Sequence, residues 1–474
     1  MSTTLAALAV VAIVTQNQVA LRAAPYDSAQ QQAVLWQGDS LEIRGQRMDY
    51  LQVWDHRRER GGYIHTSQVR TYSTQPAEAP ELLAVSRFLR DTPGSEALGI
   101  AVTAAYLKAA PAESIGAEAF DNLGTFAERL ARRASGRQGK TNDNTLAAHL
   151  EVAAHYGVAL HSFEREGRMQ ICYNGDAFRR VLALPANPEQ KARAALAVTR
   201  HDCIDPALPP LERASLDQWR AEVLDRVDLA KLPENLKNRI HLRRAGIWAS
   251  IAHDKARRGE KTQAAAHDAA SRAIDELAAT NKSELSEDDA IAYTDAAVRT
   301  GASRWAAESA SSPSQRLAVQ TAPGEPGETC VQLIDLKDGK KTPLIKRCTY
   351  GVVWSGSLAV NAQSNAATLA VQPLATWREM WVFQKNGGEW TVRVLPPALN
   401  NPELGYLEFA GWVPGGKQML AVREAKIDGR FKKSFELIRL DTLETEKKAD
   451  KPESLSIFYR WQEARWKSMT LSLR

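Results

Sequence analysis

The sequence lacks the features that mark several large classes of protein. Its N-terminal apolar run, "LAALAVVAIV" from Leu5 to Val14, has ten residues, whereas a membrane-spanning helix needs about 20. The whole chain also lacks a large excess of either charge, because it has 61 Lys and Arg and 56 Asp and Glu among 474 residues. We therefore expect a protein with no membrane span and no nucleic-acid partner.

Motifs that carry catalysis are missing as well. The segment "ASGRQGKTN" has Ala134 where a phosphate-binding loop requires glycine, and "WSGSLA" lacks the glycine spacing of a serine-hydrolase elbow. His149, His155 and His161 recur every six residues, which is not the spacing of two metal ligands on one helix face. We expect no catalytic residue, no metal and no cofactor, and a binding protein rather than an enzyme.

Cysteine is scarce, and none of it lies in a C-x-x-C motif. The four residues form two local pairs along the chain, Cys172 with Cys203 and Cys330 with Cys348. Such pairs fit two disulfides formed in an oxidising compartment, which predicts a periplasmic or otherwise exported protein. The alternative is four buried free thiols in a cytosolic protein. The N-terminal apolar run is either the remnant of an export signal or a first β-strand.

Three regions differ in their hydrophobic periodicity. Residues 10–72 alternate with period two between Gly and polar breaks, which predicts a small all-β barrel. Residues 80–310 are rich in Ala and follow a helical period, with a small β-hairpin near 158–173. Strands return over 328–474. We expect a multidomain chain with a β-barrel, a central all-α helical array and a C-terminal all-β domain.

The first region carries a recognisable set of residues. "VALRAAP" supplies Val19, Leu21, Arg22 and Pro25, and "VLWQGDSLEI" and "GGYI" follow at suitable spacing. This set resembles the bacterial SH3 (SH3b) family over about 60 residues. The resemblance implies an SH3-like barrel and a groove lined by aromatic side chains that receives a cell-wall peptide or a protein partner. The groove candidates are Tyr26, Trp36, Tyr50, Trp54 and Tyr63. The alternative for each is a place in the core of the barrel.

Two further segments have local resemblances. The Ala-rich helix pairs resemble tetratricopeptide-like hairpins, and "GWVPGGKQMLAVREAKIDGRFKKSFELIRLDTLETE" resembles one blade of TolB-like and WD40-like propellers. "YRWQEARWKSMTLSLR" is expected to begin another blade. About 150 residues make only three blades, fewer than a closed propeller needs, so we expect an open β-domain. Its tryptophans either anchor a partner or fill the core: Trp377, Trp381, Trp390, Trp412, Trp461 and Trp466.

These observations favour an exported cell-envelope binding or scaffold protein. Its SH3b module would engage peptidoglycan or a protein partner. Two alternatives remain open. One is a cell-wall hydrolase that the SH3b module targets to its substrate, and the other is an oligomeric structural component that assembles through the open edges of its sheets.

Overall fold

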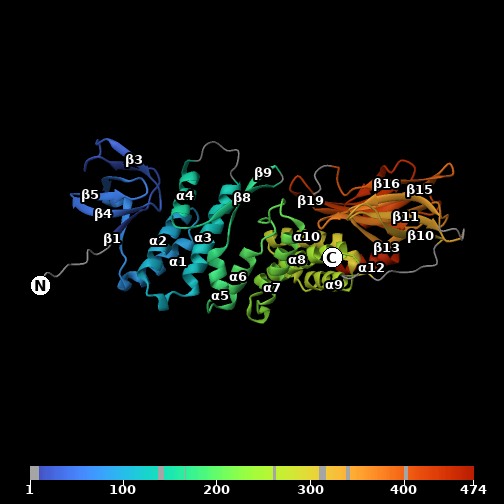
Figure 1. The fold of residues 1–474 in the computed structure, drawn as a ribbon, viewed down its shortest axis with the longest axis horizontal. Helices are drawn as coiled ribbons and strands as arrows, with labels where there is room; N and C mark the ends of the chain where they lie inside the picture. The colour runs from blue at the N-terminus through green and yellow to red at the C-terminus, as the bar shows by residue number, and fades with distance from the viewer. Residues whose placement is uncertain are drawn as a thin grey trace. The chain divides into compact units, whose positions relative to one another are not determined.

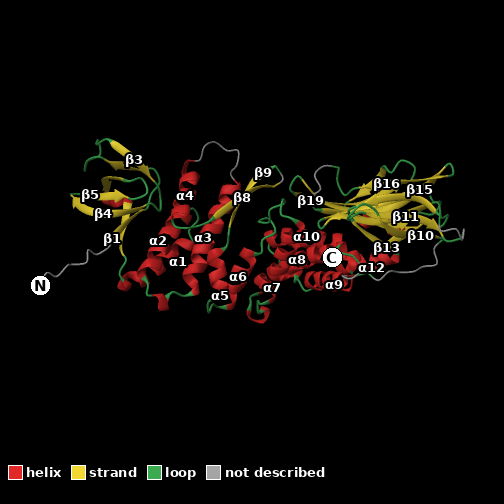
Figure 2. Cartoon of the chain, viewed as in Figure 1, coloured by secondary structure: helices red, strands yellow, loops and turns green. Residues whose placement is uncertain are grey.

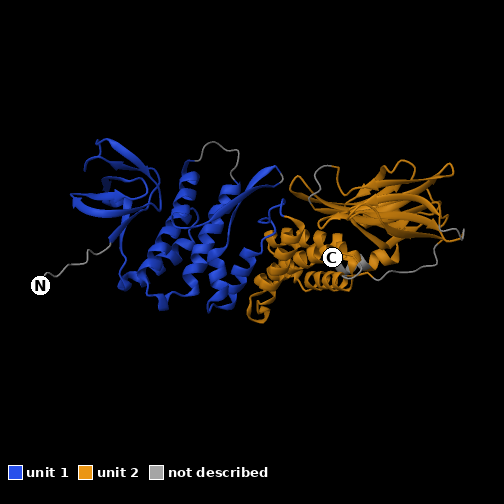
Figure 3. Cartoon of the chain, viewed as in Figure 1, with its two compact units in different colours: residues 1–208 blue, residues 209–474 orange. Residues whose placement is uncertain are grey.

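The structure, a computed structural model, describes residues 10–136, 144–165, 167–259, 263–308, 316–337, 342–399 and 404–473. The segment from Gly139 to Thr141, tested above as a phosphate-binding loop, lies outside these ranges. The chain divides into two compact units, residues 1–208 and residues 209–474 (Figure 3). The expected order of an N-terminal β-sheet, central helices and C-terminal β-sheets is present (Figures 1 and 2). Within the described ranges, no helix is both long and apolar enough to cross a bilayer.

A seven-stranded antiparallel sheet opens the first unit, in the order β3-β2-β6-β5-β4-β1-β7. Its strands are β1 (Val10–Val14), β2 (Val19–Arg22), β3 (Gln31–Leu35), β4 (Ser40–Arg47), β5 (Tyr50–Asp55), β6 (Arg60–His65) and β7 (Val69–Ser73). The period-two alternation turns one apolar set inward, and Val19, Leu21 and Leu35 are almost fully buried there. The second half of the N-terminal apolar run, Val10–Val14, is therefore a strand of this sheet.

The turn at Gly38 packs the N-terminal sheet against helices of the same unit. The Gly38 φ of +93° is a left-handed turn conformation that favours glycine. A Cβ at this position would also lie 2.6 Å from the carbonyl oxygen of Ala97 and 2.9 Å from Cγ1 of Val152. The Tyr156 hydroxyl donates to the Gly38 carbonyl at 3.0 Å. The turn therefore packs against two helices, so that the sheet and helices share one compact body.

Among its described residues, the first unit is completed by six α-helices and one β-hairpin. They are α1 (Ala79–Arg90), α2 (Glu96–Ala109), α3 (Ala117–Gly136), α4 (Asn144–His155), β8 (Leu160–Arg165), β9 (Arg168–Tyr173), α5 (Asp176–Ala183) and α6 (Pro188–Val198). Apolar side chains from α1 to α4 form their core together with Ile13 and Tyr72 of the sheet. A disulfide between Cys172 and Cys203 ties β9 to the segment after α6. It closes a loop of 31 residues and so restricts the unfolded chain.

The second unit begins with four helices: α7 (Pro210–Asp225), α8 (Glu234–Arg257), α9 (Gln263–Ala278) and α10 (Glu287–Ser303). Ala245, Leu277 and Ala296 bring α8, α9 and α10 together in one cluster. Small alanine side chains let these helices approach closely. The short helix η7 (Arg304–Ala306) leads toward the C-terminal sheets.

The C-terminal sheets of this unit contain eleven strands in the part of the chain that the structure describes. They are β10 (Leu317–Pro323), β11 (Thr329–Asp335), β12 (Pro343–Thr349), β13 (Val352–Val360), β14 (Ala366–Leu374), β15 (Trp377–Asn386), β16 (Glu389–Leu395), β17 (Gly405–Trp412), β18 (Gln418–Ile427), β19 (Arg430–Arg439) and β20 (Thr445–Ala449). β10 to β12 form one three-stranded sheet, and the others form an eight-stranded sheet in which β15 and β17 pair in parallel.

Apolar clusters show how these strands are layered. Leu333 of β11 packs with Phe383 of β15 in one cluster, and Met380 of β15 packs with Leu407 and Met419 in another. The β13–β16 layer therefore has β10–β12 on one face and β17–β20 on the other. Trp377, Trp381 and Trp466 are buried, Trp390 and Trp412 are half-buried, and Trp461 is exposed. Three of these six tryptophans thus lie in the core rather than on a free surface.

The C-terminal segment corrects one expectation. The described part of "YRWQEARWKSMTLSLR" does not begin another set of strands but lies mostly in helices α11 (Ser456–Trp461) and α12 (Ala464–Leu473). Phe458 and Trp466 from these helices meet Phe435 in edge-to-face contacts with ring centroids 5.1 and 6.3 Å apart. The helices cover the outer apolar face of the last strands, which an additional blade would otherwise have to bury.

Candidate ligand-binding face of the N-terminal sheet

The outer face of the N-terminal sheet carries three of the five aromatic residues expected to bind ligand. Side chains alternate along a strand, so Leu51 and Val53 of β5 point into the core while Tyr50 and Trp54 point away from it. Tyr63 joins them because it lies opposite Gln52, which alternates with them on β5. The strand register therefore places Tyr50, Trp54 and Tyr63 on one surface.

Tyr63 is the centre of this face. It lies directly opposite Arg22 of β2 on one side and opposite Gln52 of β5 on the other. Tyr63 is half-buried and Gln52 is exposed, so this row offers an aromatic ring, a guanidinium group and an amide to solvent. These groups suit a polar ligand with flat or apolar portions, because the ring supplies contact area while the neighbours supply hydrogen bonds.

Tyr50 is buried and stabilises the neighbouring loop, so it is not available for direct contact with a ligand. It is only 7% exposed, and its hydroxyl donates to Asp27 Oδ1 at 2.5 Å. This hydrogen bond to the carboxylate raises the pKa of Tyr50 above its ordinary value. The His65 ring packs edge-on against the Tyr50 ring, 5.2 Å between centroids. Tyr50 thereby holds the loop between β2 and β3, which carries Tyr26, at this end of the face.

Tyr26 is the most exposed of the five aromatic candidates, with 56% of its surface accessible. It lies next to Asp27, so the hydrogen bond from Tyr50 fixes the backbone close to it. Arg22 Nη1 also donates to the Ala29 carbonyl in the same loop at 3.1 Å. A surface loop held from both sides can present its aromatic side chain with little conformational freedom to lose on binding.

The two tryptophans are less well placed for ligand contact than the tyrosines, because the Trp54 ring is partly covered and Trp36 lies at the other end of β3. The Trp54 ring has the Arg44 guanidinium over it at 4.5 Å, and a Cβ on Gly61 would lie 3.2 Å from its Cε3 atom. Trp54 is therefore half-covered by its own sheet. Trp36 follows the far end of β3, where its backbone N–H donates to Asp39. The structure thus brings together Tyr26, Tyr50 and Tyr63, with Trp54 beside them, and places Trp36 at the opposite end of β3.

The polar residues of this face, Gln52 and His65, were not identified from the sequence. The ion pairs that hold the charged hairpin tip were not identified from it either. Gln52 and His65 were detectable, because period two puts them on the same side as Tyr50 and Tyr63. The tip "DHRRERGG" is held by Arg58, which forms ion pairs with Asp55 at 2.7 Å and Asp39 at 3.0 Å. That network joins two turns distant in sequence, and no local pattern signals it.

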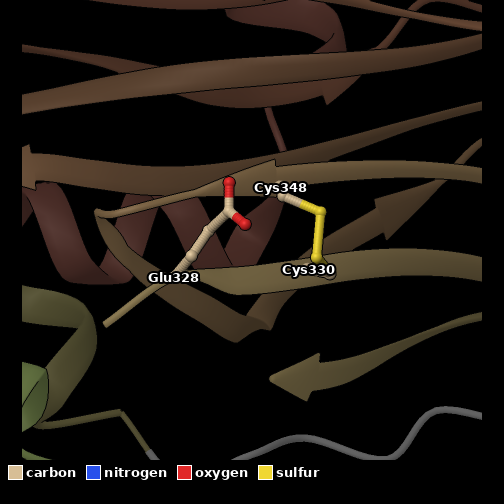
Figure 4. A group of neighbouring side chains, drawn as sticks. All are labelled: Glu328, Cys330 and Cys348. Atoms are coloured by element: carbon tan, nitrogen blue, oxygen red, sulfur yellow. A yellow bond between two sulfur atoms is a disulfide. The ribbon is translucent and has the colours of Figure 1, made fainter. Parts of the chain in front are cut away.

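One further group of side chains has the residue types of a metal site. Within the described ranges, Glu328, Cys330 and Cys348 place their ligand atoms within 4.8 Å of one another. Figure 4 shows that the two sulfurs are joined in a disulfide beside the Glu328 carboxylate. Disulfide sulfurs carry no thiolate to donate to a metal, and Glu328 Oε2 accepts from the Glu325 N–H at 3.1 Å. The group is a structural cross-link between β11 and β12.

Comparisons with known proteins do not identify a family or a function for this chain. No protein-family model matches the chain, and the comparisons with curated proteins and with solved structures likewise give no match. The geometry of the N-terminal face and the two disulfides therefore carry the functional conclusion.

Proposed function

We propose that the protein is an exported cell-envelope binding protein that engages peptidoglycan peptides through the outer face of an SH3b-type N-terminal module. The observation that carries the proposal is the row of Arg22, Tyr63 and Gln52 beside the anchored Tyr26 loop. Aromatic side chains next to guanidinium and amide groups are the composition of a peptide-binding surface. The SH3b resemblance of the same residues indicates a cell-wall ligand.

The two disulfides support the export part of the proposal. Cys172–Cys203 and Cys330–Cys348 use all the cysteines of the chain, and no cysteine is left free. Structural disulfides persist in oxidising compartments and are rare in the cytosol. The periplasm or another site outside the cytosol is therefore the proposed location.

The finer fold proposal concerns the C-terminal sheets. Strands β13–β16 and β17–β20 each follow one another as antiparallel neighbours, and the β10–β12 sheet packs against the first of these sets. Successive meanders stacked face to face support an open array of propeller-like blades, with α11 and α12 covering its end. In this proposal the array and the Ala-rich helical hairpins act as a scaffold for the binding face.

Co-sedimentation of the full-length protein with purified peptidoglycan tests the function. The Tyr63→Ala variant is expected to bind at least about tenfold more weakly, because a central aromatic contact is commonly worth 2 kcal/mol or more. Tyr350→Ala is the matched control, since Tyr350 is 61% exposed and lies in the second unit. It should bind as the wild type does.

Three results would contradict the proposal. One is a wild type that stays in the supernatant, and another is a Tyr63→Ala variant that sediments as well as the control does. Clearing of the peptidoglycan suspension by the wild type would instead favour the hydrolase alternative.

A further inference from the structure

A separate cleft lies among the helices of the first unit. It has a volume of about 530 Å³ and is lined by the C-terminal end of α1, one stripe of α3 and the N-terminal turn of α6. Its lining includes Arg90, Glu118, Asp121, Arg129, Glu189 and Arg193. This volume falls in the range of small-molecule sites, but the lining is polar where most such sites are largely apolar. The ligand must therefore be recognised through hydrogen bonds and charges.

Asp121 is the unusual member of this lining. It is only 1% exposed, and its Oδ1 atom has no hydrogen-bond partner among the described residues. Its other oxygen, Oδ2, accepts from Arg193 Nη2 at 3.1 Å, and Arg90 Nη1 lies 3.9 Å from it. A buried carboxylate oxygen without a donor is costly, so the unpartnered oxygen of this cleft-lining residue indicates a missing donor.

The acidic neighbours of Asp121 are already paired. Arg87, which does not line the cleft, donates to both carboxylate oxygens of Glu118 at 2.6 and 3.0 Å. Glu189 lies 3.4 Å from Arg193 Nη1, and Asp91 lies 3.4 Å from Arg90 Nε. Among the described acidic residues of the lining, Asp121 is thus the buried one with an unpartnered oxygen, and that oxygen is available to a ligand donor.

The basic groups of the cleft have capacity left for an acceptor. Arg129 donates to the backbone carbonyls of Arg90 at 2.6 Å and Thr92 at 3.4 Å, neither of which carries a formal charge. Its nearest carboxylate, Glu96, lies 4.0 Å away and also pairs with Arg133. A guanidinium group has five N–H donors, so Arg129 retains donors and most of its positive charge for a ligand carboxylate.

We propose that this cleft binds a small zwitterion, an amino acid or a short peptide, whose ammonium group donates to Asp121 Oδ1 and whose carboxylate is held by Arg129. The near balance of charge in the lining matches a ligand that carries both signs, whereas a simple anion would face Asp121 and a simple cation would face the three arginines. The site is distinct from the outer face of the N-terminal sheet and does not depend on the function proposed for that face.

Isothermal titration of the full-length protein with L-alanyl-L-alanine tests the inference. N-acetyl-L-alanyl-L-alanine removes the ammonium group, and L-alanyl-L-alanine amide removes the carboxylate. The unmodified dipeptide should bind, and each modified form should bind at least about tenfold more weakly, because a hydrogen bond to a charged group contributes that much or more. Inorganic phosphate and ethylammonium serve as probes of a simple anion and a simple cation.

Asp121→Asn is the informative variant, because it keeps the size of the side chain and removes its charge. It should reduce dipeptide affinity at least about tenfold. Asp268→Asn is the matched control outside the cleft, where the Asp268 side chain is 82% exposed, and it should change affinity by less than about threefold. Circular dichroism establishes that each variant is folded. If Asp121→Asn is not folded, the affinities of the wild type for the three dipeptide forms test the inference instead.

The inference is overturned by any of several results. These are the absence of dipeptide binding at millimolar concentration, equal binding of the acetylated dipeptide, or unchanged dipeptide affinity in a folded Asp121→Asn variant. Phosphate binding that exceeds dipeptide binding and strengthens in Asp121→Asn would identify a simple anion site instead. Because the titration requires no peptidoglycan, its failure is separate from failure of the co-sedimentation experiment.

Discussion

Replacement of Glu408 by Gln is expected to destabilise the second unit strongly. Glu408, on β17, is 6% exposed and forms an ion pair with the buried Arg304 of η7. Arg378 of β15, which is fully buried, has its Nη2 atom 3.5 Å from the same carboxylate. One buried carboxylate therefore serves two buried guanidinium groups. The Glu408→Gln variant removes the shared carboxylate charge from both guanidinium groups, and breaking a buried pair in this way costs about 3–5 kcal/mol.

The Arg378→Met variant should behave in the opposite way. None of the Arg378 nitrogens has a hydrogen-bond partner among the described residues, and the guanidinium lies 5.0 Å from the Tyr406 ring centroid. Burial, together with repulsion from Arg304, lowers the pKa of Arg378 well below its ordinary value. Methionine is apolar and fills a similar space, so this change should leave the free energy of unfolding within about 1 kcal/mol of the wild type or increase it.

Urea unfolding at pH 7, followed by tryptophan fluorescence and by circular dichroism, measures both variants. A domain has about 5–15 kcal/mol of stability, so the expected loss in Glu408→Gln would move its transition to much lower urea concentration. The reasoning is refuted if Glu408→Gln unfolds like the wild type. It is also refuted if Arg378→Met loses more than about 3 kcal/mol, because Arg378 would then contribute more than its burial costs.

Two further predictions concern a histidine and a disulfide. Burial lowers the pKa of His253 to about 4, so the unfolded state takes up a proton first, and stability should fall by up to about 3 kcal/mol as the pH falls from 6.5 to 4. The His253→Gln variant should lose this part of the pH dependence in urea titrations, and an unchanged pH profile would contradict the assignment. Replacing Cys172 and Cys203 together by Ala should lower the free energy of unfolding by about 3–4 kcal/mol, since the disulfide closes a loop of 31 residues. A loss below about 1 kcal/mol in calorimetry would show that the cross-link restricts the unfolded chain little.

Local patterns in the sequence predicted much of the fold. The alternation that buries Leu21 and Leu35 identified the N-terminal sheet, and Gly38 stands at a turn that requires its positive φ. The two local cysteine pairs are the two disulfides. Each of these features depends on residues close together in sequence, where hydrophobic period and turn chemistry are informative.

Features that depend on distant segments were not predictable in the same way. Asp121 and Arg193 are 72 residues apart, and the polar stripe of α3 that lines the cleft looks like an ordinary solvated helix face in the sequence. Arg378 and Glu408 likewise look like exposed strand residues until β15 and β17 pair in parallel. The C-terminal helices were mistaken for strands because "YRWQEARWKSMTLSLR" resembled the start of the preceding tryptophan-led segment, and so short a segment gives little periodicity to decide between helix and strand.

Hydrogen exchange of the full-length protein with and without soluble peptidoglycan fragments tests the central claim most directly. The fragments should slow exchange in β5, β6 and the loop from residue 23 to residue 30, and this protection should be absent in Tyr63→Ala but retained in Tyr350→Ala. Protection confined to other segments, or none at saturating fragment concentration, would contradict the claim that this face binds the cell wall.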